Sequence, residues 1–320
     1  MRLLVTGGLG FIGSNFIRQM LEGHPEHSIV NLDKVTYAGN PENLKDIAGD
    51  PRYTFIRGDI CDPDLVGSVF REHQIDAVVH FAAESHVDRS IEDASVFVRT
   101  NVLGTHVLLE EALNHGVERF VHVSTDEVYG SIRSGSFREI DNLNPSSPYS
   151  ASKAASDLLA RSYYITHDLP VIVTRCTNNF GPYQYPEKLI PLFVTNLLDG
   201  KKVPVYGTGK NVRDWIYVLD HNRAIDFVLR HGEPGEIYNI GGDNEKSNLE
   251  ITEGILRVLG KDESMIEYVR DRPGHDWRYS LDSSKLRSMG WKPEFDFEAA
   301  LQATVEWYVE NAWWWRPLKQ

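Results

Sequence analysis

Residues 2–13 of this 320-residue chain read R-L-L-V-T-G-G-L-G-F-I-G. The first five residues predict a short buried strand, and Gly7, Gly10 and Gly13 follow it in G-x-x-G-x-x-G spacing. A helix is expected from about Phe11 to Glu22. Glycines let the backbone turn tightly and approach a pyrophosphate, which the N-terminus of a helix then stabilises. Three glycines alone are a weak signal, but a strand before them and a helix after them favour a dinucleotide-binding unit.

The second predicted strand, S-I-V-N-L-D, ends at Asp33, about twenty residues beyond the last of these glycines. An acid at this place hydrogen-bonds the adenosine ribose hydroxyls and repels a 2′-phosphate, which favours NAD over NADP. Asp33 taken alone is also compatible with a simple turn cap.

The following sequence alternates strands and helices. Further strands are expected at 53–57, 77–81, 120–124, 170–176 and 237–240, with helices at 63–72, 94–115, 147–166 and 221–231. This alternation predicts an α/β protein with a doubly wound parallel sheet of the Rossmann type. We expect an NAD-binding domain at 1–176 with a returning segment at about 214–241. A smaller α/β substrate domain should comprise 177–213 and 242–320.

The composition excludes several classes of protein. A hydrophobic content of 41% and a charged content of 25% are ordinary for a globular domain, and the net charge of −13 argues against a nucleic-acid partner. Cys61 and Cys176 lie far apart, so neither a disulfide framework nor a cysteine zinc site is indicated. His86 has no second His or Cys at ligand spacing, and no metal is expected. No signal peptide or membrane span is visible, so the expected location is the cytoplasm.

Two residues four apart, Tyr149 and Lys153, follow a helix start at Ser147 and Pro148. Residues at this spacing share one helix face, so the phenol and the ammonium can reach one spot. A nearby cation and the helix dipole both favour the phenolate, which predicts a lowered tyrosine pKa and a general base for a sugar hydroxyl. The alternative is a tyrosine and a lysine on an ordinary surface helix.

Two adjacent acids, Asp126 and Glu127, follow the strand V-H-V-S-T. Ligands of open α/β sheets bind beyond the carboxyl ends of strands. Adjacent carboxyls repel, so one can stay protonated while the other ionises, which supplies the acid and the base that elimination of water requires. This interpretation requires the chain to turn here, and the alternative is two solvated loop acids.

The second half of the chain is suited to an anionic, hydroxyl-rich ligand. Residues 177–191 read T-N-N-F-G-P-Y-Q-Y-P-E-K-L-I-P, which predicts a loop around a neutral polar group. Basic residues that can hold phosphate stand at Lys210, Arg213, Arg270, Arg272 and His275. The run from Trp313 to Trp315 is expected to pack internally or at an interface.

Several motifs together resemble the extended short-chain dehydrogenase/reductase family: T-G-G-x-G-F-I-G, S-T-D-E-V-Y-G and Y-x-x-x-K. Within this family, A-A-E-S-H-V-D-R-S, T-D-E-V-Y-G, V-R-D-W and D-R-P-G-H are similar to the dTDP-glucose 4,6-dehydratases, over nearly the whole chain. Leu9, Phe180 and Leu219 depart from the pattern, and Leu9 in the glycine loop bears on cofactor affinity.

The resemblance implies a mechanism on dTDP-glucose. Tyr149 takes the proton of the C4 hydroxyl, which Thr125 also holds, while NAD accepts the C4 hydride. Glu127 then removes the C5 proton, Asp126 protonates the departing C6 hydroxyl, and the hydride returns to C6. Lys153 orients the nicotinamide ribose, and the recycled cofactor should stay bound.

The resemblance also implies the binding residues. The cofactor positions are Gly7, Gly10, Phe11, Ile12, Gly13, Asp33, Lys34, Thr36, Asp59, Ile60, Phe81, Ala82, Ala83, Ser85, Thr100, Tyr149, Lys153 and Asn179. The substrate positions are Ser85, Thr125, Asn178, Lys188, Leu189, Pro204, Tyr206, Arg213, Asn248, Asp271, Arg272 and His275. A homodimer is expected through the helices at 94–115 and 148–166.

Three alternatives remain at this point. The first is UDP-glucose as the substrate, since one methyl group on the base separates the nucleotides and is discriminated only modestly. The second is an epimerase or decarboxylase on the same fold, in which Asp126 would be idle. The third is a non-catalytic NAD-sensing protein, which would not need Tyr149, Lys153 and Glu127.

Overall fold

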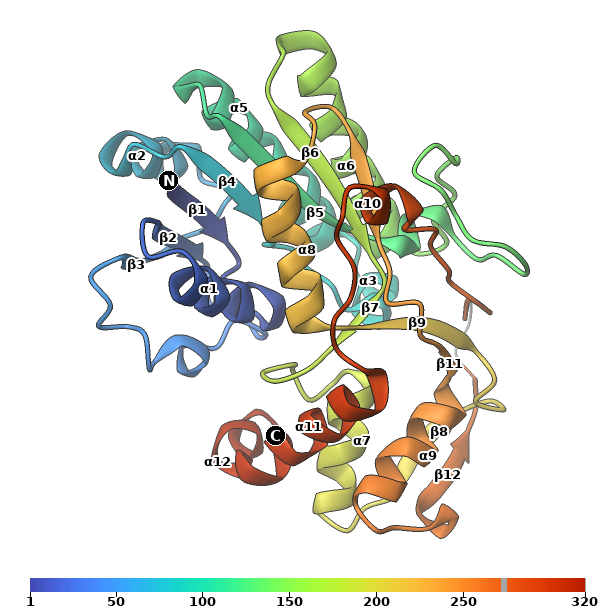
Figure 1. The fold of residues 1–320 in the computed structure, drawn as a ribbon. Helices are drawn as coiled ribbons and strands as arrows, with labels where there is room; N and C mark the ends of the chain where they lie inside the picture. The colour runs from blue at the N-terminus through green and yellow to red at the C-terminus, as the bar shows by residue number, and fades with distance from the viewer. Residues whose placement is uncertain (272–274, 320) are drawn as a thin grey trace.

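The computed structural model describes residues 1–271 and 275–319. Its main element is a seven-stranded parallel sheet of order β10-β6-β5-β4-β1-β2-β3 (Figure 1). The strands are β1 (Arg2–Thr6), β2 (Ser28–Asp33), β3 (Tyr53–Arg57), β4 (Ala77–His80), β5 (Arg119–Thr125), β6 (Val171–Cys176) and β10 (Ile237–Ile240). The order reverses between β1 and β4, and this switch point is where open α/β sheets bind their ligands. The predicted doubly wound Rossmann sheet is confirmed.

Helices cover both faces of this sheet, so all of its strands except the edge strand β3 are largely buried. The helices are α1 (Phe11–Gly23), α8 (Val218–His231), α2 (Pro63–His73), α5 (Thr105–His115) and α6 (Pro148–His167). Side chains alternate along a strand, so Leu3 and Val5 pack in one core with α1 and α8, whereas Leu4 packs with α2, α5 and α6. The sheet therefore lies between two apolar cores. Packing on both faces fixes the positions of the strands and of their carboxyl ends.

The helix predicted at 94–115 is present in the crossover between β4 and β5, but its middle is π-helical. The elements α4 (Ser95–Phe97), the π-helical segment η2 (Val98–Gly104) and α5 follow one another without a break. The buried side chain of Asn101 lies in this wider turn and donates to the Ser152 hydroxyl at 2.8 Å and to the Glu84 carbonyl at 3.0 Å. Single π turns occur frequently at functional sites. Here the turn joins α6 to the loop after β4.

Helix α6 begins as the sequence predicts. The Ser147 hydroxyl accepts from the Ser150 amide at 3.1 Å, and the Ser150 hydroxyl accepts from the Ser147 amide at 3.0 Å. This reciprocal capping box satisfies two backbone donors that would otherwise lack partners at the start of the helix. The register of α6 is thereby set, and the helix buries the side chains of Tyr149 and Lys153.

The smaller lobe packs around a third apolar core. One sheet has the order β11-β9-β7 and another pairs β12 with β8 (Figure 1). Its elements are β7 (Asn178–Phe180), α7 (Leu189–Leu198), β8 (Val203–Tyr206), β9 (Val212–Tyr217), β11 (Glu245–Ser247), α9 (Asn248–Val258), β12 (Ile266–Val269) and α11 (Phe297–Glu310). The segment 177–191, predicted as a loop, thus contains β7 and the start of α7. We propose that 177–213 and 242–320 form the substrate domain.

The remaining elements are short. They are the helices α3 (Val87–Glu92), α10 (Ser284–Ser288) and α12 (Ala312–Trp315), with 3-10 turns η1 (Pro41–Leu44), η3 (Asp126–Tyr129), η4 (Glu263–Met265) and η5 (Arg316–Leu318). Within the described residues, no helix is both long enough and apolar enough to cross a bilayer.

The tryptophan run links the C-terminus to the glycine loop. Trp314 and Trp315 are buried, whereas Trp313 is 56% exposed. The Trp314 indole N–H donates to Asn43 Oδ1 at 2.7 Å, and Asn43 Nδ2 donates to the Leu9 carbonyl at 2.8 Å. Leu9, which departs from the family pattern, therefore lies in a loop that these hydrogen bonds hold in place. Its own side chain packs in the core.

Replacing Asn43 by alanine is expected to destabilise the fold by about 2–4 kcal/mol, because two buried groups lose their partners at about 1–3 kcal/mol each. Urea unfolding of Asn43→Ala measures this loss. If Asn43→Ala is as stable as the parent chain, the two hydrogen bonds of Asn43 do not stabilise the fold as expected.

Candidate active site

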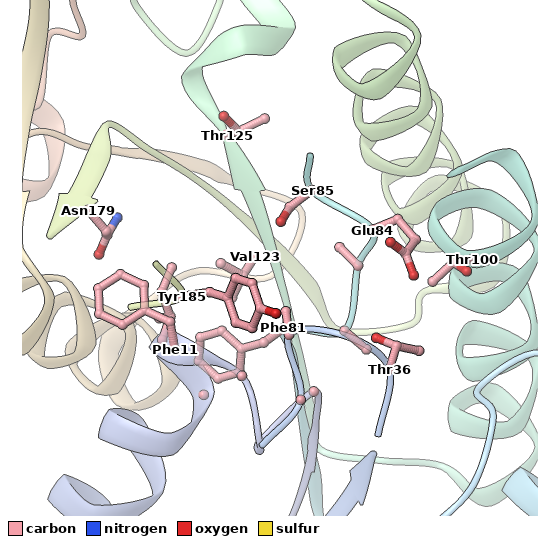
Figure 2. Close-up of a pocket in the computed structure, with 18 of the residues that line it drawn as sticks. Phe11, Thr36, Phe81, Glu84, Ser85, Thr100, Val123, Thr125, Asn179 and Tyr185 are labelled. Atoms are coloured by element: carbon pink, nitrogen blue, oxygen red, sulfur yellow. The ribbon is translucent and has the colours of Figure 1, made fainter. Parts of the chain in front are cut away.

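One cavity of about 330 Å³ lies beyond the carboxyl ends of the sheet strands (Figure 2). Its walls come from the glycine loop, the ends of β2 and β4, the π turn, the end of β5, the start of α6 and the 176–188 segment. Every residue predicted for the cofactor lines this cavity, as do the five predicted catalytic residues. The sequence-predicted cofactor and catalytic positions are thus brought to one place.

The glycine loop fits closely against its neighbours. Gly7 has φ +71°, and a Cβ there would lie 2.7 Å from the backbone of Ala82. A Cβ on Gly13 would lie 2.5 Å from the Gly7 carbonyl oxygen. Side chains are therefore excluded, and the N-terminus of α1 opens directly onto the cavity. This cradle fits a pyrophosphate group, which backbone amides and the helix dipole would stabilise.

The carboxylate of Asp33 is buried at the end of β2. Its two oxygens accept from the Leu9 amide at 2.9 Å and from the Val35 amide at 2.8 Å, and burial raises its pKa. Asp33 thus caps a turn, as the sequence allows, and also lines the cavity. Next to it, Lys34 pairs with Asp59 at 2.8 Å, so two predicted cofactor residues form one ion pair at the adenine end that the sequence predicts.

Tyr149 and Lys153 reach the cavity from the first two turns of α6. Lys153 Nζ donates to the Val123 carbonyl oxygen at 2.8 Å. The predicted lowering of the tyrosine pKa is wrong for the protein alone. Burial, with Glu127 next in effect, raises the Tyr149 pKa well above its ordinary value, although a hydrogen bond with Thr125 acts in the opposite direction.

The two acids stand where the chain turns out of β5, as their predicted roles require. Residues 126–129 form the turn η3, and the Glu127 amide donates to the Thr125 hydroxyl at 3.3 Å. Asp126 is only 3% exposed, and burial, followed by the charge of Glu127, raises its pKa well above the ordinary carboxyl value. Burial therefore favours the protonated form of the Asp126 carboxyl. Glu127 is half-buried and also lines the cavity.

Two polar atoms near this turn are buried without a hydrogen-bond partner among the residues that the structure describes: Asp126 Oδ2 and Asn179 Oδ1. Buried polar groups in proteins are almost always paired. Because both residues line the cavity, these atoms are suited to contact a ligand bound there.

The predicted substrate positions fall into two groups. Ser85, Thr125, Asn178 and Lys188 line the cavity, with Lys188 Nζ donating to the Ser85 carbonyl oxygen at 3.2 Å. The positions outside its lining are Leu189, Pro204, Tyr206, Arg213, Asn248, Asp271 and His275. Arg272 lies outside the described residues.

The second group is held together through the 271–279 segment. Arg213 donates to the carbonyl oxygen of Asp276 at 3.0 Å, and the rings of Tyr206 and His275 meet edge to face at 6.3 Å. His275 pairs with Asp271 at 2.7 Å. The positive charge of Arg213 offsets part of the rise in the Asp126 pKa, so Arg213 lies near the turn that carries the two acids.

Sequence reasoning missed several residues of the site. The lining also includes Tyr37, Glu84, Gln184, Tyr185 and Glu187, some of which Figure 2 shows around the cavity. Arg89, on α3, lies over the Tyr37 ring at 4.0 Å and pairs with Glu187 at 3.5 Å, which connects three segments of the chain beside the cavity. Glu84 and Arg89 lie in A-A-E-S-H-V-D-R-S, and Gln184, Tyr185 and Glu187 lie in P-Y-Q-Y-P-E-K, but only the folded chain shows the contact.

The glycine cradle, Asp33 and the buried Tyr149/Lys153 pair define an NAD(P)-dependent enzyme of the extended short-chain dehydrogenase/reductase class. A family model described as GDP-mannose 4,6 dehydratase matches residues 4–304. The dTDP-glucose 4,6-dehydratase of Streptomyces niveus is 57% identical over 100% of this chain and 96% of its own length. The chain belongs to the dTDP-glucose 4,6-dehydratase family.

Solved structures agree with this assignment. DesIV, a dTDP-glucose 4,6-dehydratase from Streptomyces venezuelae solved with NAD bound, superposes with a TM-score of 0.97 at 57% identity over the whole of both chains. UDP-glucose 4-epimerase from Thermus thermophilus, at 32% identity over 97% of this chain and 99% of its own, has a TM-score of 0.89. The fold alone therefore does not separate dehydratases from epimerases, and the site must do so.

Proposed function

We propose that this chain is a dTDP-glucose 4,6-dehydratase, which converts dTDP-glucose to dTDP-4-keto-6-deoxyglucose. The observation that carries the proposal is the turn after β5, where a buried Asp126 with a raised pKa stands next to Glu127 in the cavity that Tyr149 also lines. An acid and a base at one place can remove water from a sugar. Membership of the dTDP-glucose 4,6-dehydratase family supports the choice of substrate.

NAD supplies redox chemistry when bound, accepting a hydride from C4 of the sugar and returning it to C6. The glycine cradle would hold its pyrophosphate at the N-terminus of α1. Asp33, at the end of β2, would accept hydrogen bonds from the adenosine ribose and reject a 2′-phosphate. The loops that meet at Arg89 and Tyr37 would cover the mouth and keep the cofactor bound through repeated turnovers.

The first proton transfer is assigned to Tyr149, with Thr125 holding the same C4 hydroxyl. In the protein alone the Tyr149 pKa is raised, so the tyrosine must be activated when the site is filled. The positive charges that can do so are the nicotinamide ring and Lys153. Burial lowers the Lys153 pKa, and the charge of Asp157 opposes that lowering. Tyr149 is a proposed base of the assembled complex and not of the empty protein.

The loss of water is assigned to the two acids. The ketone at C4 makes the C5 proton acidic, and Glu127 removes it. Asp126, whose pKa is raised by burial, gives its proton to the C6 hydroxyl as that group leaves as water. Glu127 thus ends the step protonated, and Asp126 ends it ionised. When the C5–C6 double bond is reduced, a proton from solvent replaces the one lost from C5.

The diphosphate end of the substrate is assigned to the second group of residues. Arg213 carries the charge for this purpose, since a guanidinium can bind phosphate oxygens in pairs. Asn248, at the start of α9, lies beside it because its amide donates to the Asn211 carbonyl at 3.0 Å. Tyr206 and His275 would flank the nucleotide base.

The direct test is to incubate purified protein with dTDP-glucose and no added cofactor, then add alkali and record the ultraviolet absorbance of a 4-keto-6-deoxy sugar. The proposal expects product from cofactor retained through purification. Absence of product with NAD supplied would refute it. UDP-glucose is tested in parallel, and faster turnover of UDP-glucose would reassign the nucleotide.

We also propose a homodimer through the helices beside the π turn. Apolar side chains are exposed on α6 and on η2, which lie next to each other (Figure 1). They include Leu158 at 59% and Ile165 at 67% exposure, seven residues apart on one face of α6, and Val98 and Leu103 on the neighbouring turn. Such a face is typical of a buried interface.

Replacing Ile165 by glutamate is expected to shift the protein from dimer to monomer, because a charge buried in an apolar interface costs several kcal/mol. Sedimentation velocity measures the change. Ile140→Glu is the matched control, since Ile140 is 80% exposed and lies on a distant loop. A parent protein that sediments as a monomer, or a dimer unaffected by Ile165→Glu, would refute the proposed interface.

A cytoplasmic location is proposed as well. Both cysteines, Cys61 and Cys176, are free and buried in the structure, which suits a reducing compartment. Cell fractionation with an antibody to the chain tests this, and recovery outside the cytoplasm would overturn it.

A further inference from the structure

A cluster of metal-ligating side chains lies far from the active site, in the turn between α1 and β2. The sequence there reads H-P-E-H at residues 24–27, and we expected no metal from it. The rings of His24 and His27 stack at 4.9 Å with an interplanar angle of 13°. Glu26 Oε1 lies 3.6 Å from His24 Nδ1 and 3.3 Å from His27 Nδ1. The three ligand atoms all lie within 4.8 Å of one another.

We propose that His24, Glu26 and His27 bind a divalent transition-metal ion, with Zn²⁺ as the natural occupant. Zinc–ligand distances of about 2.0–2.1 Å in a tetrahedral site place the ligand atoms about 3.3–3.4 Å apart. Two of the three separations in this turn already have nearly that value. The third separation lies within 4.8 Å, and metal binding requires the two stacked rings to turn so that both nitrogens face the ion. A water molecule would complete the fourth position.

A second observation, from a different element, points to the same ligand. Asp226 on α8 lies with Oδ2 3.2 Å from His24 Nε2, the ring nitrogen that faces away from the cluster. Arg230 holds Asp226 with two hydrogen bonds, at 3.0 Å and 2.7 Å. A carboxylate on the remote nitrogen of a histidine fixes its tautomer and orients it toward a metal. Asp226 therefore directs His24 Nδ1 toward the cluster.

The surroundings of His27 allow a cation at this place. The ring is 6% exposed, and its Nδ1 also lies 3.3 Å from the amino group of Met1, a contact that a metal ion would replace. The Glu26 carboxylate supplies negative charge from the solvent side. Two imidazoles and one carboxylate are ligands that Zn²⁺ and Co²⁺ share.

The distance from the cavity indicates a structural role for the ion. The thirteen residues of α1 separate the cluster from the glycine loop, a length of about 20 Å at 1.5 Å per residue. Because Asp226 and Arg230 lie on α8, an ion here would connect the first crossover turn to the helix that packs against α1. Binding to the folded state alone would raise its stability by mass action.

The test uses tag-free protein and Co²⁺ as the probe. We expect one Co²⁺ per chain with the strong visible absorption of a four-coordinate ion, displaced by one equivalent of Zn²⁺. Glu26→Gln and His24→Gln should each weaken Zn²⁺ binding at least about tenfold, and Asp226→Asn should weaken it about 10- to 100-fold by releasing the His24 ring. Glu26 is exposed, so its substitution does not threaten folding.

The matched control is His115→Gln. His115 Nδ1 lies 3.6 Å from Glu111 Oε2, so it offers an isolated histidine–carboxylate pair without a third ligand. Its substitution should leave the Zn²⁺ affinity unchanged. The proposal is overturned if the parent protein binds no Co²⁺ in four-coordinate form, or if Glu26→Gln and His24→Gln bind Zn²⁺ as tightly as His115→Gln does. The readout is metal binding, so its failure is distinct from failure of the dehydratase activity.

Discussion

Tyr149→Phe is expected to lower kcat on dTDP-glucose by about 10²–10⁴-fold, the usual contribution of a positioned general base. The substitution removes one oxygen atom, and the first proton transfer loses its acceptor. Because C4 oxidation precedes every later step, neither a ketone nor reduced cofactor should form. Stopped-flow recording of the near-ultraviolet absorbance of reduced nicotinamide, with product assay by alkali, measures both.

The control for this prediction is the cofactor content of the variant. Tyr149 is held by α6 through its backbone, whose amide donates to Ser90 at 3.2 Å, so the cavity should keep its shape and its NAD. Activity within tenfold of the parent protein in a variant that retains NAD would show that another group takes the C4 proton.

Asp126→Asn is expected to slow loss of water by about 10²–10⁴-fold while C4 oxidation continues. Burial raises the Asp126 pKa, which favours the protonated carboxyl, and the amide has nearly the shape of that form but cannot act as an acid. Reduced cofactor should therefore accumulate in the presence of dTDP-glucose, and the 4-keto-6-deoxy product should appear only slowly. This pattern distinguishes a dehydratase from an epimerase, for which Asp126 would be idle.

Stability measurements separate the chemical role of Asp126 from a structural one. A carboxyl whose pKa is raised on folding costs stability above its unfolded pKa, and the cost grows until pH passes the folded value. Asp126→Asn removes this cost, so the variant should be at least as stable as the parent at neutral pH. Glu127→Gln is the partner control, since it also leaves C4 oxidation possible and blocks removal of the C5 proton. Unchanged dehydration in Asp126→Asn would refute its assignment as the acid.

The sheet and the cofactor positions were predictable from local sequence. Strands β1, β2, β3 and β10 begin and end as predicted, because buried parallel strands are short apolar runs bounded by glycines or polar residues. The capped start of α6 was equally visible. Once these elements are fixed, the carboxyl ends of the strands meet at one edge, and the residues there must line the same cavity.

The features that local sequence patterns did not predict depend on contacts between residues far apart in the sequence. The π turn at 98–104 exists because Asn101 bonds to Glu84 and Ser152, which are remote in sequence. The raised pKa of Tyr149 reflects burial that an exposed-helix argument ignores. Likewise, the approach of His24 to Asp226 joins the turn after α1 to α8, so neither segment alone indicates a ligand set.

The most direct measurement follows the hydrogen on C4. Purified protein is incubated with dTDP-glucose deuterated at C4, and the product is analysed by proton and deuterium NMR. The account predicts that the deuterium moves to C6 of the same sugar while C5 takes a proton from solvent, because oxidation, elimination and reduction occur in one cavity with one retained NAD. Deuterium that stays at C4 with inverted configuration, or that is lost to solvent, would contradict it.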